Sequence, residues 1–257
     1  MKISEWPVGL AEKDLIRAIV CFETQEKETN RLPFFADGFP GLIYFQSEAK
    51  VTVFAGIESK VMEPLFIYGQ TIEPITIQFE APFRMFMLQL FPSVIGSAFG
   101  IPIHELTNSC WSIPREEWGI LQTLDSIENS CDIPETINSL VDLIVKRLAN
   151  FKPDPILHQC IDLLVSHQGN YEIKDLTKLF GISERTLQRR FENYVGLTPK
   201  QFTNIIRFQS GLSKMKNSKK TQLTDIAYET GYFDQSHFIR HFKNFTKQKP
   251  FSFREKK

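Results

Sequence analysis

The chain has 257 residues, of which 42% are hydrophobic and 23% charged, values typical of a globular protein with room for two domains. No apolar run approaches the roughly 18 residues of a membrane span, and no apolar signal core follows the first two residues. We therefore expect a cytoplasmic protein that does not associate with a membrane.

The formal net charge of zero conceals an uneven distribution of charge along the chain. Residues 1–152 hold 12 Lys and Arg against 20 Asp and Glu, whereas residues 153–257 hold 18 against 10. The two halves therefore carry net charges of −8 and +8. Such a division predicts one domain that meets a polyanion and one that does not, although basic surfaces also occur on proteins that bind none.

The segment from Leu32 to Phe91 is rich in β-branched and aromatic residues and is interrupted by Gly and Pro. Short strands with turn signals at this spacing predict an antiparallel barrel or sandwich. The predicted strands are Gly41–Gln46, Val51–Ala55, Leu65–Tyr68, Ile75–Phe79 and Phe83–Phe91. Residues 83–88 do not alternate between apolar and polar, which predicts a strand buried on both faces.

Helical patterns follow Pro92. Short helical turns are predicted at Ser93–Phe99 and Ile103–Thr107, and a longer helix at Pro134–Asn150. The apolar residues of the longer helix recur at spacings of three and four, so they form a stripe that must be covered. This stripe consists of Ile137, Leu140, Val141, Ile144, Val145 and Leu148. It packs on the strands of its own chain or on the same helix of a second subunit, and both arrangements remain open.

The N-terminal region lacks the residue patterns of a metal site or a nucleophilic centre. His104 is its first histidine, which excludes a multi-histidine metal site in the strands, and no Ser, Cys or Asp has a suitably placed His. We expect no enzymatic activity, no metal and no cofactor. Five aromatic side chains line a ligand pocket or, in the simpler interpretation, fill the core. They are Phe34, Phe35, Phe39, Tyr44 and Phe45.

The four cysteines are widely spaced and include no CxxC pair. In a chain without an export signal this pattern favours buried, reduced thiols over disulfides.

The same pattern occurs twice in the last third of the chain. With a shift of 51 residues, Leu187 falls on Phe238 and Arg189 falls on Arg240. A tandem repeat of this size predicts two helix-turn-helix units, at about residues 173–196 and 222–246, joined by a helix at 199–215. The two prolines of 152–155 disfavour helix and mark a linker, so we place the domains at 1–152 and 153–257.

Local signals define the helices of these units. Gly181 suits the left-handed backbone that follows a helix, Ser183 and Asp234 can cap the helices after them, and Thr198-Pro199 starts the joining helix. A joining helix of roughly 17 residues spans about 25 Å. With the bulk of the units added, their second helices would lie near the roughly 34 Å pitch of one DNA turn.

The second helix of each unit, here termed its recognition helix, carries one polar face. We predict that these faces contact DNA through Arg185, Gln188, Arg189, Gln235, Ser236, Ile239, Arg240 and Lys243. Arg can hold a guanine edge and Gln an adenine edge with two hydrogen bonds each, and an apolar side chain can touch a thymine methyl. The alternative is an ordinary solvated helix face. His237 and His241 have metal-ligand spacing, but no carboxylate or cysteine is placed to complete a site.

The second unit also contains a distinctive set of residues at fixed spacing. They are Ile226-Ala227, Gly231-Tyr232, Asp234-Gln-Ser-His-Phe238, Arg240-His-Phe-Lys243, and Pro250 followed by Phe253-Arg254. With the first unit, they make residues 156–254 resemble the DNA-binding domain of the AraC/XylS family of bacterial transcription regulators. Thr177 and Lys247 depart from the family pattern, which usually has alanine and glycine at these positions.

The N-terminal region resembles a poorly characterised β-rich domain that often precedes this module. The resemblance rests on Asp37-Gly38, Gly69-Gln70, Phe91-Pro92 and Ile101–Thr107. The two resemblances imply an α+β protein in which a small, cupin-like β-barrel with appended helices precedes an all-α tandem helix-turn-helix domain. They imply a sequence-specific transcription regulator of double-stranded DNA, an activator with RNA polymerase as a partner, whose N-terminal domain senses a small-molecule effector or forms a homodimer.

Two other functions remain open. One is a DNA-binding protein without an effector. The other is a DNA-repair alkyl acceptor, because this kind of module is sometimes fused to one, but none of the four cysteines lies in a compact acceptor motif.

Overall fold

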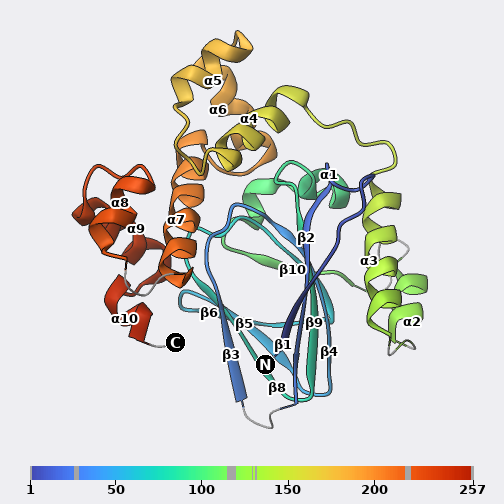
Figure 1. Cartoon of the computed structure of the whole chain (residues 1–257). Coiled ribbons are helices and arrows are strands. Elements are labelled where there is room, and N and C mark those ends of the chain that lie inside the picture. The colour runs from blue at the N-terminus through green and yellow to red at the C-terminus, as the bar shows by residue number, and fades with distance from the viewer. Residues whose placement is uncertain are drawn as a thin grey trace. The chain divides into compact units, whose positions relative to one another are not determined.

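The computed structural model describes residues 2–25, 29–114, 120–128, 130, 132–217 and 221–255. The chain divides into two compact units. The N-terminal unit comprises Met1–Phe34, Phe39–Gly69 and Ile75–Lys152, and the C-terminal unit comprises Phe35–Gly38, Gln70–Pro74 and Pro153–Lys257. The first unit contains the strands, and the second is built from the helices coloured yellow to red in Figure 1.

The described strands of the N-terminal unit form two antiparallel sheets. One has the order β1-β2-β9-β4-β7-β10 and the other the order β3-β8-β5-β6. Their bounds are β1 Lys2–Trp6, β2 Ile16–Thr24, β3 Thr29–Phe34, β4 Gly41–Ser47, β5 Val51–Ala55, β6 Glu58–Met62, β7 Leu65–Tyr68, β8 Ile75–Glu80, β9 Phe83–Leu90 and β10 Cys110–Ser112.

The central position of β9 follows from its apolar sequence. It lies between β2 and β4. Met85 and Met87 belong to a core cluster that also contains inward-facing residues of β5 and β8, whereas Phe86 and Leu88 are buried on the opposite face. The prediction of a strand buried on both faces is therefore confirmed.

The α+β class is confirmed, but the strands of the described chain do not close into a barrel. They form two separate sheets with the core cluster between them. A barrel requires a continuous hydrogen-bonded ladder around its axis, whereas a sandwich needs only two inward-facing surfaces. Turn spacing and alternation are similar in the two arrangements, so the sequence pattern did not separate them.

Helices follow β9 in the N-terminal unit. They are α1 Ile95–Phe99, the 3-10 helix η1 Ile103–Leu106, α2 Leu121–Glu128 and α3 Ile133–Arg147. The predicted stripe of α3 packs against α2 and α1 of the same chain, with Leu140 and Ile144 fully buried. The Nε of Arg147 donates to the carbonyl oxygen of Ala98 at 2.7 Å and fastens the end of α3 to α1. Only Val145, 37% exposed, lies clearly outside this packing.

The C-terminal unit is helical apart from its two short segments 35–38 and 70–74. Its helices are α4 Pro155–Ser166, α5 Ile173–Phe180, α6 Glu184–Tyr194, α7 Pro199–Asn217, α8 Leu223–Glu229, α9 Gln235–Thr246 and α10 Pro250–Glu255. The long helix α7 contacts α6 of the first helix pair and α8 and α9 of the second, and all four are labelled in Figure 1. Phe202 of α7 packs edge-on against Phe191 of α6 at 5.7 Å, and Phe208 stacks on Phe245 of α9 at 4.8 Å.

Polar side chains complete the helix ends of this unit. Asp154 accepts from the backbone N–H of Ile156 at 3.1 Å and so caps α4. The same carboxylate pairs with the guanidinium of Arg190 on α6. Thr177, at a position where the family usually has alanine, is buried, and its hydroxyl donates to the carbonyl oxygen of Lys174 at 2.9 Å.

Three cysteines are buried free thiols, and Cys131 lies outside the described residues. Burial raises the pKa of Cys21 to about 11 and the pKa of Cys110 and Cys160 to about 12. Every helix in the described chain is too short or too polar to cross a lipid bilayer.

Candidate DNA interface

The first helix-turn-helix unit is formed by α5 and α6. Helix α5 ends at Gly181, whose φ of +61° is the left-handed conformation that glycine adopts at little cost. The hydroxyl oxygen of Ser183 then accepts from the backbone N–H of Thr186 at 3.1 Å and caps α6. Leu187 and Phe191 of α6 are completely buried. The inward anchoring of these two residues fixes the rotation of α6 about its axis.

This rotation exposes the predicted contact face of α6. Arg185, Gln188 and Arg189 are all exposed, as is Glu192 one turn further on. The side-chain amide of Gln188 donates one N–H to Glu192 at 2.8 Å, which leaves its second N–H and its carbonyl oxygen for other partners. Arg185 and Arg189 place two exposed guanidinium groups on the N-terminal half of the recognition helix.

The second unit repeats this construction with α8 and α9. Asp234 accepts from the backbone N–H of His237 at 2.7 Å and caps α9, while Phe238 and Phe242 are completely buried. Because these two core positions lie four residues apart, the opposite face of α9 points outward. Among the predicted contact residues of α9, Ser236, Arg240 and Lys243 are exposed and Gln235 and Ile239 are half-buried.

Gln235 is tied to the first helix of its own unit. Its side-chain carbonyl accepts from the hydroxyl of Thr224 on α8 at 2.9 Å. Its amide group is the part that would meet DNA, at the leading edge of α9. Both recognition helices thus present two cations and at least one amide on a face held in place by buried aromatic side chains.

The two units differ at the end of one helix. Lys247 follows α9 with a φ of +55°, whereas its counterpart in the first unit, 51 residues earlier, is Gly196, with a φ of +79°. A side chain at this φ is strained because its Cβ crowds the backbone. The lysine that replaces the family's usual glycine at position 247 therefore introduces local backbone strain at the end of the second recognition helix.

The histidine pair of α9 is half-buried. The Nε2 atoms of His237 and His241 lie 3.2 Å apart, and both rings pack edge-on against Tyr232. Burial, and then the neighbouring His237, lower the pKa of His241 to about 4. Within the described residues, no group of three or more His, Cys, Asp or Glu side chains is arranged to hold a metal ion.

A cavity beside α6 adds residues that the sequence pattern did not single out. It has a volume of about 740 Å³ and runs from the start of α5 to the start of α7. Gln188 lines it together with Lys174, Lys200 and Arg207. Lysines on a polar surface have no distinctive sequence pattern, so only their position beside the recognition helix marks them as candidates for phosphate contact.

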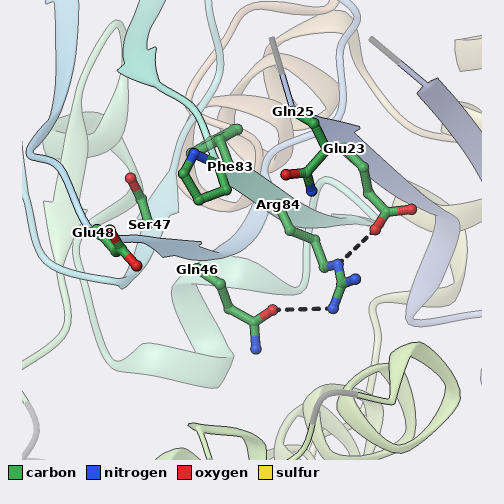
Figure 2. Close-up of a pocket in the computed structure, with 8 residues that line it drawn as sticks. Glu23, Gln25, Gln46, Ser47, Glu48, Phe83 and Arg84 are labelled. Carbon is green, nitrogen blue, oxygen red and sulfur yellow. Dashed lines mark hydrogen bonds and ion pairs between the residues drawn. The ribbon is translucent and has the colours of Figure 1, made fainter. Parts of the chain in front are cut away.

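A second cavity, of about 380 Å³, lies in the N-terminal unit at the ends of β2, β4 and β9 (Figure 2). Figure 2 shows the guanidinium of Arg84 between two partners. Its Nε donates to Glu23 at 2.8 Å and its Nη1 to Gln46 at 3.4 Å. The rest of the lining consists of Gln25, Ser47, Glu48, Pro82 and Phe83.

The simpler interpretation of the five aromatic residues, that they fill the core, holds for the buried ones. Of the aromatic candidates, Phe39, Tyr44 and Phe45 are buried in the core. The signal that could have found this cavity is Arg84, a charged residue within the apolar run of β9.

Comparison with known proteins identifies the helical region. Residues 176–256 match a family model described as a helix-turn-helix domain. The HTH-type transcriptional activator RhaS of Yersinia pestis (strain Pestoides F) is 34% identical over 98 residues, which cover 37% of this chain and 34% of RhaS. The C-terminal region is an AraC/XylS-type helix-turn-helix domain. Residues 11–112 match a domain of unknown function, DUF6597, so the region before the AraC-type domain is of uncharacterised type.

The relatives of the AraC-type domain extend well beyond the match. An uncharacterised HTH-type transcriptional regulator of Haemophilus influenzae is 32% identical over 95 residues, covering 37% of this chain and 32% of its own length. The chain thus spans about a third of the length of these curated relatives.

Solved structures resemble the chain over both regions. Wild-type ToxT from Vibrio cholerae strain SCE256, solved with an unsaturated fatty acid bound, has a TM-score of 0.51 at 15% identity, over 92% of this chain and 94% of ToxT. A second ToxT structure has a TM-score of 0.50 at 14% identity, over 92% and 97%. At these identities the likeness shows the fold alone: a β-rich region followed by an AraC-type helical region.

Proposed function

We propose that this chain is a sequence-specific DNA-binding transcription regulator whose two recognition helices, α6 and α9, enter successive major grooves. The observation that carries the proposal is the matched exposure of the two helices. Arg189 and Arg240 are equivalent in the repeat, and each projects from a helix whose opposite face is completely buried. Arginine in the major groove can bind a guanine edge with two hydrogen bonds, which contribute about 1–3 kcal/mol of discrimination.

Helix α7 supports simultaneous binding by both units. It has 19 residues and spans about 28 Å at 1.5 Å per residue. This length, with the helix pairs at its two ends, suits the roughly 34 Å that separate equivalent faces of the major groove. The net charge of +8 on residues 153–257 supplies the sequence-independent attraction to phosphate.

The test begins with genomic fragments retained by the purified full-length protein, because the operator is not given by the sequence. On a retained fragment, Arg189→Ala and Arg240→Ala should each weaken binding by about tenfold or more in a gel-shift titration. Arg31→Ala removes the same charge from an exposed position on β3 and is the matched control. Wild-type affinity in both recognition-helix variants would contradict the proposal.

Activation is the direction of regulation that the named relatives favour. RhaS is described as a transcriptional activator, and an activator requires RNA polymerase as a partner. A reporter gene placed behind a retained fragment distinguishes the two directions. Loss of the protein should lower reporter expression, whereas a rise would show repression.

We further propose that the N-terminal unit senses a compact, hydrophilic effector in the Arg84 cavity. Glu23 pairs with the guanidinium of Arg84 there, and Glu48 lies on the opposite side of the cavity (Figure 2). Carboxylate and amide oxygens of the lining can accept hydrogen bonds. This chemistry suits a small amine or polyol that donates hydrogen bonds. The fatty acid of the ToxT structure is a different class of ligand, because a long apolar tail finds few apolar side chains in this lining.

One hydrogen bond connects the cavity lining to helix α2 of the same unit. The side chain of Gln46, which accepts from Arg84, donates through its amide to the carbonyl oxygen of Ile127 on α2 at 3.5 Å. A thermal-shift screen of the full chain against small amines, polyols and fatty acids tests the proposal. Stabilisation by an amine or polyol that Glu48→Gln abolishes would support it. If no member of the panel has an effect, the DNA-binding protein without an effector becomes the better description.

The alkyl-acceptor alternative gains no support from the described cysteines. A cysteine nucleophile requires an accessible thiol with a lowered pKa. Cys21, Cys110 and Cys160 are buried, and burial raises the pKa of each.

A further inference from the structure

Strand β6 is an open edge of the four-stranded sheet. It is last in the order β3-β8-β5-β6 and, within the part of the chain that the structure describes, pairs with β5 alone. The two strands are joined by Gly56 and Ile57, and the φ of +61° at Gly56 matches a tight two-residue hairpin. From Glu58 to Val61 every residue of β6 is exposed. The outer side of this strand is therefore accessible to another strand.

Backbone groups on the outer side of β6 point away from β5. The Ala55–Glu58 pair closes the hairpin and exchanges hydrogen bonds, so by the alternation of an antiparallel ladder the next pair, Phe54–Ser59, does not. The N–H and C=O of Ser59 consequently face outward. Such an edge is a template for strand addition.

The side chains of β6 are self-complementary in one register. When a second copy of β6 runs antiparallel with Ser59 opposite Ser59, Glu58 lies opposite Lys60 of the second copy, and Lys60 lies opposite its Glu58. Ile57 of each copy then lies opposite Val61 of the other copy. These two side chains are 105% and 54% exposed in the single chain. This single register therefore pairs opposite charges with each other and apolar side chains with each other.

The neighbouring registers are unfavourable. The register can shift only by steps that keep the inward-facing side chains of one strand opposite the inward-facing side chains of the other. Centring the pairing on residue 58 places Glu58 against Glu58, and centring it on residue 60 places Lys60 against Lys60. Lysine on a short edge strand usually prevents pairing, but here Glu58 neutralises it in the Ser59-centred register.

We propose that β6 is a homodimerisation edge, on which a second copy of this chain adds its own β6 antiparallel and centred on Ser59. The two four-stranded sheets then form one continuous sheet across the two copies. The inference is independent of the proposed function, since it concerns the chain without DNA or effector. The contact is short, so the dimer forms in a concentration-dependent manner.

Sedimentation velocity of the full-length protein over a range of concentrations, without DNA, tests the proposal. Wild type should shift from monomer to dimer as concentration rises. Glu58→Lys and Lys60→Glu should each raise the dimer dissociation constant by about tenfold or more, because each creates like-charge pairs on both sides of the two-fold axis. The double variant E58K/K60E exchanges the charges and should restore dimerisation.

Controls separate this edge from other surfaces. Ser59→Pro removes the outward N–H and should abolish the dimer, whereas Val145→Lys on α3 should leave it intact. Intrinsic tryptophan fluorescence verifies that each variant is folded. A protein that stays monomeric at all concentrations overturns the proposal. So does a dimer that both single charge reversals leave unchanged, that the charge exchange fails to restore, or that Val145→Lys dissociates.

Discussion

The left-handed residues that end α5 and α9 provide a pair of substitutions with opposite expected signs. Gly181 has a φ of +61°, and a Cβ built on it meets no atom within 4 Å. Gly181→Ala therefore changes only the conformational preference of the backbone. The left-handed conformation costs a non-glycine residue roughly 1–2 kcal/mol, and the reduced freedom of the unfolded chain offsets about 0.4–1 kcal/mol of it.

We expect Gly181→Ala to destabilise the C-terminal unit by about 1 kcal/mol. In a domain of this size that loss corresponds to a decrease of about 4–8 °C in Tm. Lys247→Gly, at a φ of +55°, should stabilise the unit by a similar or slightly smaller amount. The gain is smaller because Lys247 also forms an exposed ion pair with Glu73 at 2.9 Å, and such pairs contribute about 0–1 kcal/mol. Glu73→Gln measures that contribution separately.

Two spectroscopic signals distinguish the units in the intact chain. All three tryptophans (6, 111 and 118) lie within residues 1–152, so intrinsic fluorescence reports on the N-terminal unit. Far-ultraviolet circular dichroism reports mainly on helices, most of which belong to the C-terminal unit. The dichroism transition should move down for Gly181→Ala and up for Lys247→Gly, with the fluorescence transition unchanged. An unaltered transition in Gly181→Ala, or a lower one in Lys247→Gly, would refute the strain argument.

Two further predictions concern the second helix-turn-helix unit. Gly211→Ala in α7 should destabilise it by about 1–2 kcal/mol, although alanine normally favours a helix interior, because the new Cβ would lie 2.8 Å from Cε2 of the buried Phe238 ring. Ser213→Ala, exposed on the same helix, is the control, and a more stable Gly211→Ala protein in urea denaturation would contradict the packing. Folding lowers the pKa of His241 from 6.5 to about 4 through burial and His237, so the unfolded state takes up the proton first. Stability should therefore be retained above about pH 6.5 and lost as the pH falls toward 4. His241→Phe should flatten this part of the pH profile, and an unchanged profile would show that other groups cause it.

The helical region was predictable in detail because its signals are local. Gly181, Ser183 and Asp234 each act within one turn of their own position, through backbone conformation or a cap. The recognition faces follow from the spacing of buried residues such as Phe238 and Phe242, which lie one turn apart. DNA contact by these faces remains a prediction that follows from their exposure.

The β-rich region was predicted only in part, since β2, Ile16–Thr24, was missed although it is rich in apolar residues. The strand Val51–Ala55 was found with its observed bounds, whereas β6, Glu58–Met62, was missed because three of its five residues are polar. A strand is stabilised by its neighbour in the sheet, and β6 exists because β5 offers a partner across a two-residue turn.

Sequence alone determined the division of charge, the tandem repeat and the outward faces of the recognition helices, since each depends on residues close together in the chain. Only the tertiary structure decided that the strands form two sheets, and that Glu23, Gln46 and Arg84 meet at one cavity. Those three residues lie on three strands that are far apart in sequence. The ladder registers that place Arg84 opposite both Glu23 and Gln46 are set by the packing of whole strands, because a one-residue slip would exchange the side chains on the two buried faces of β9.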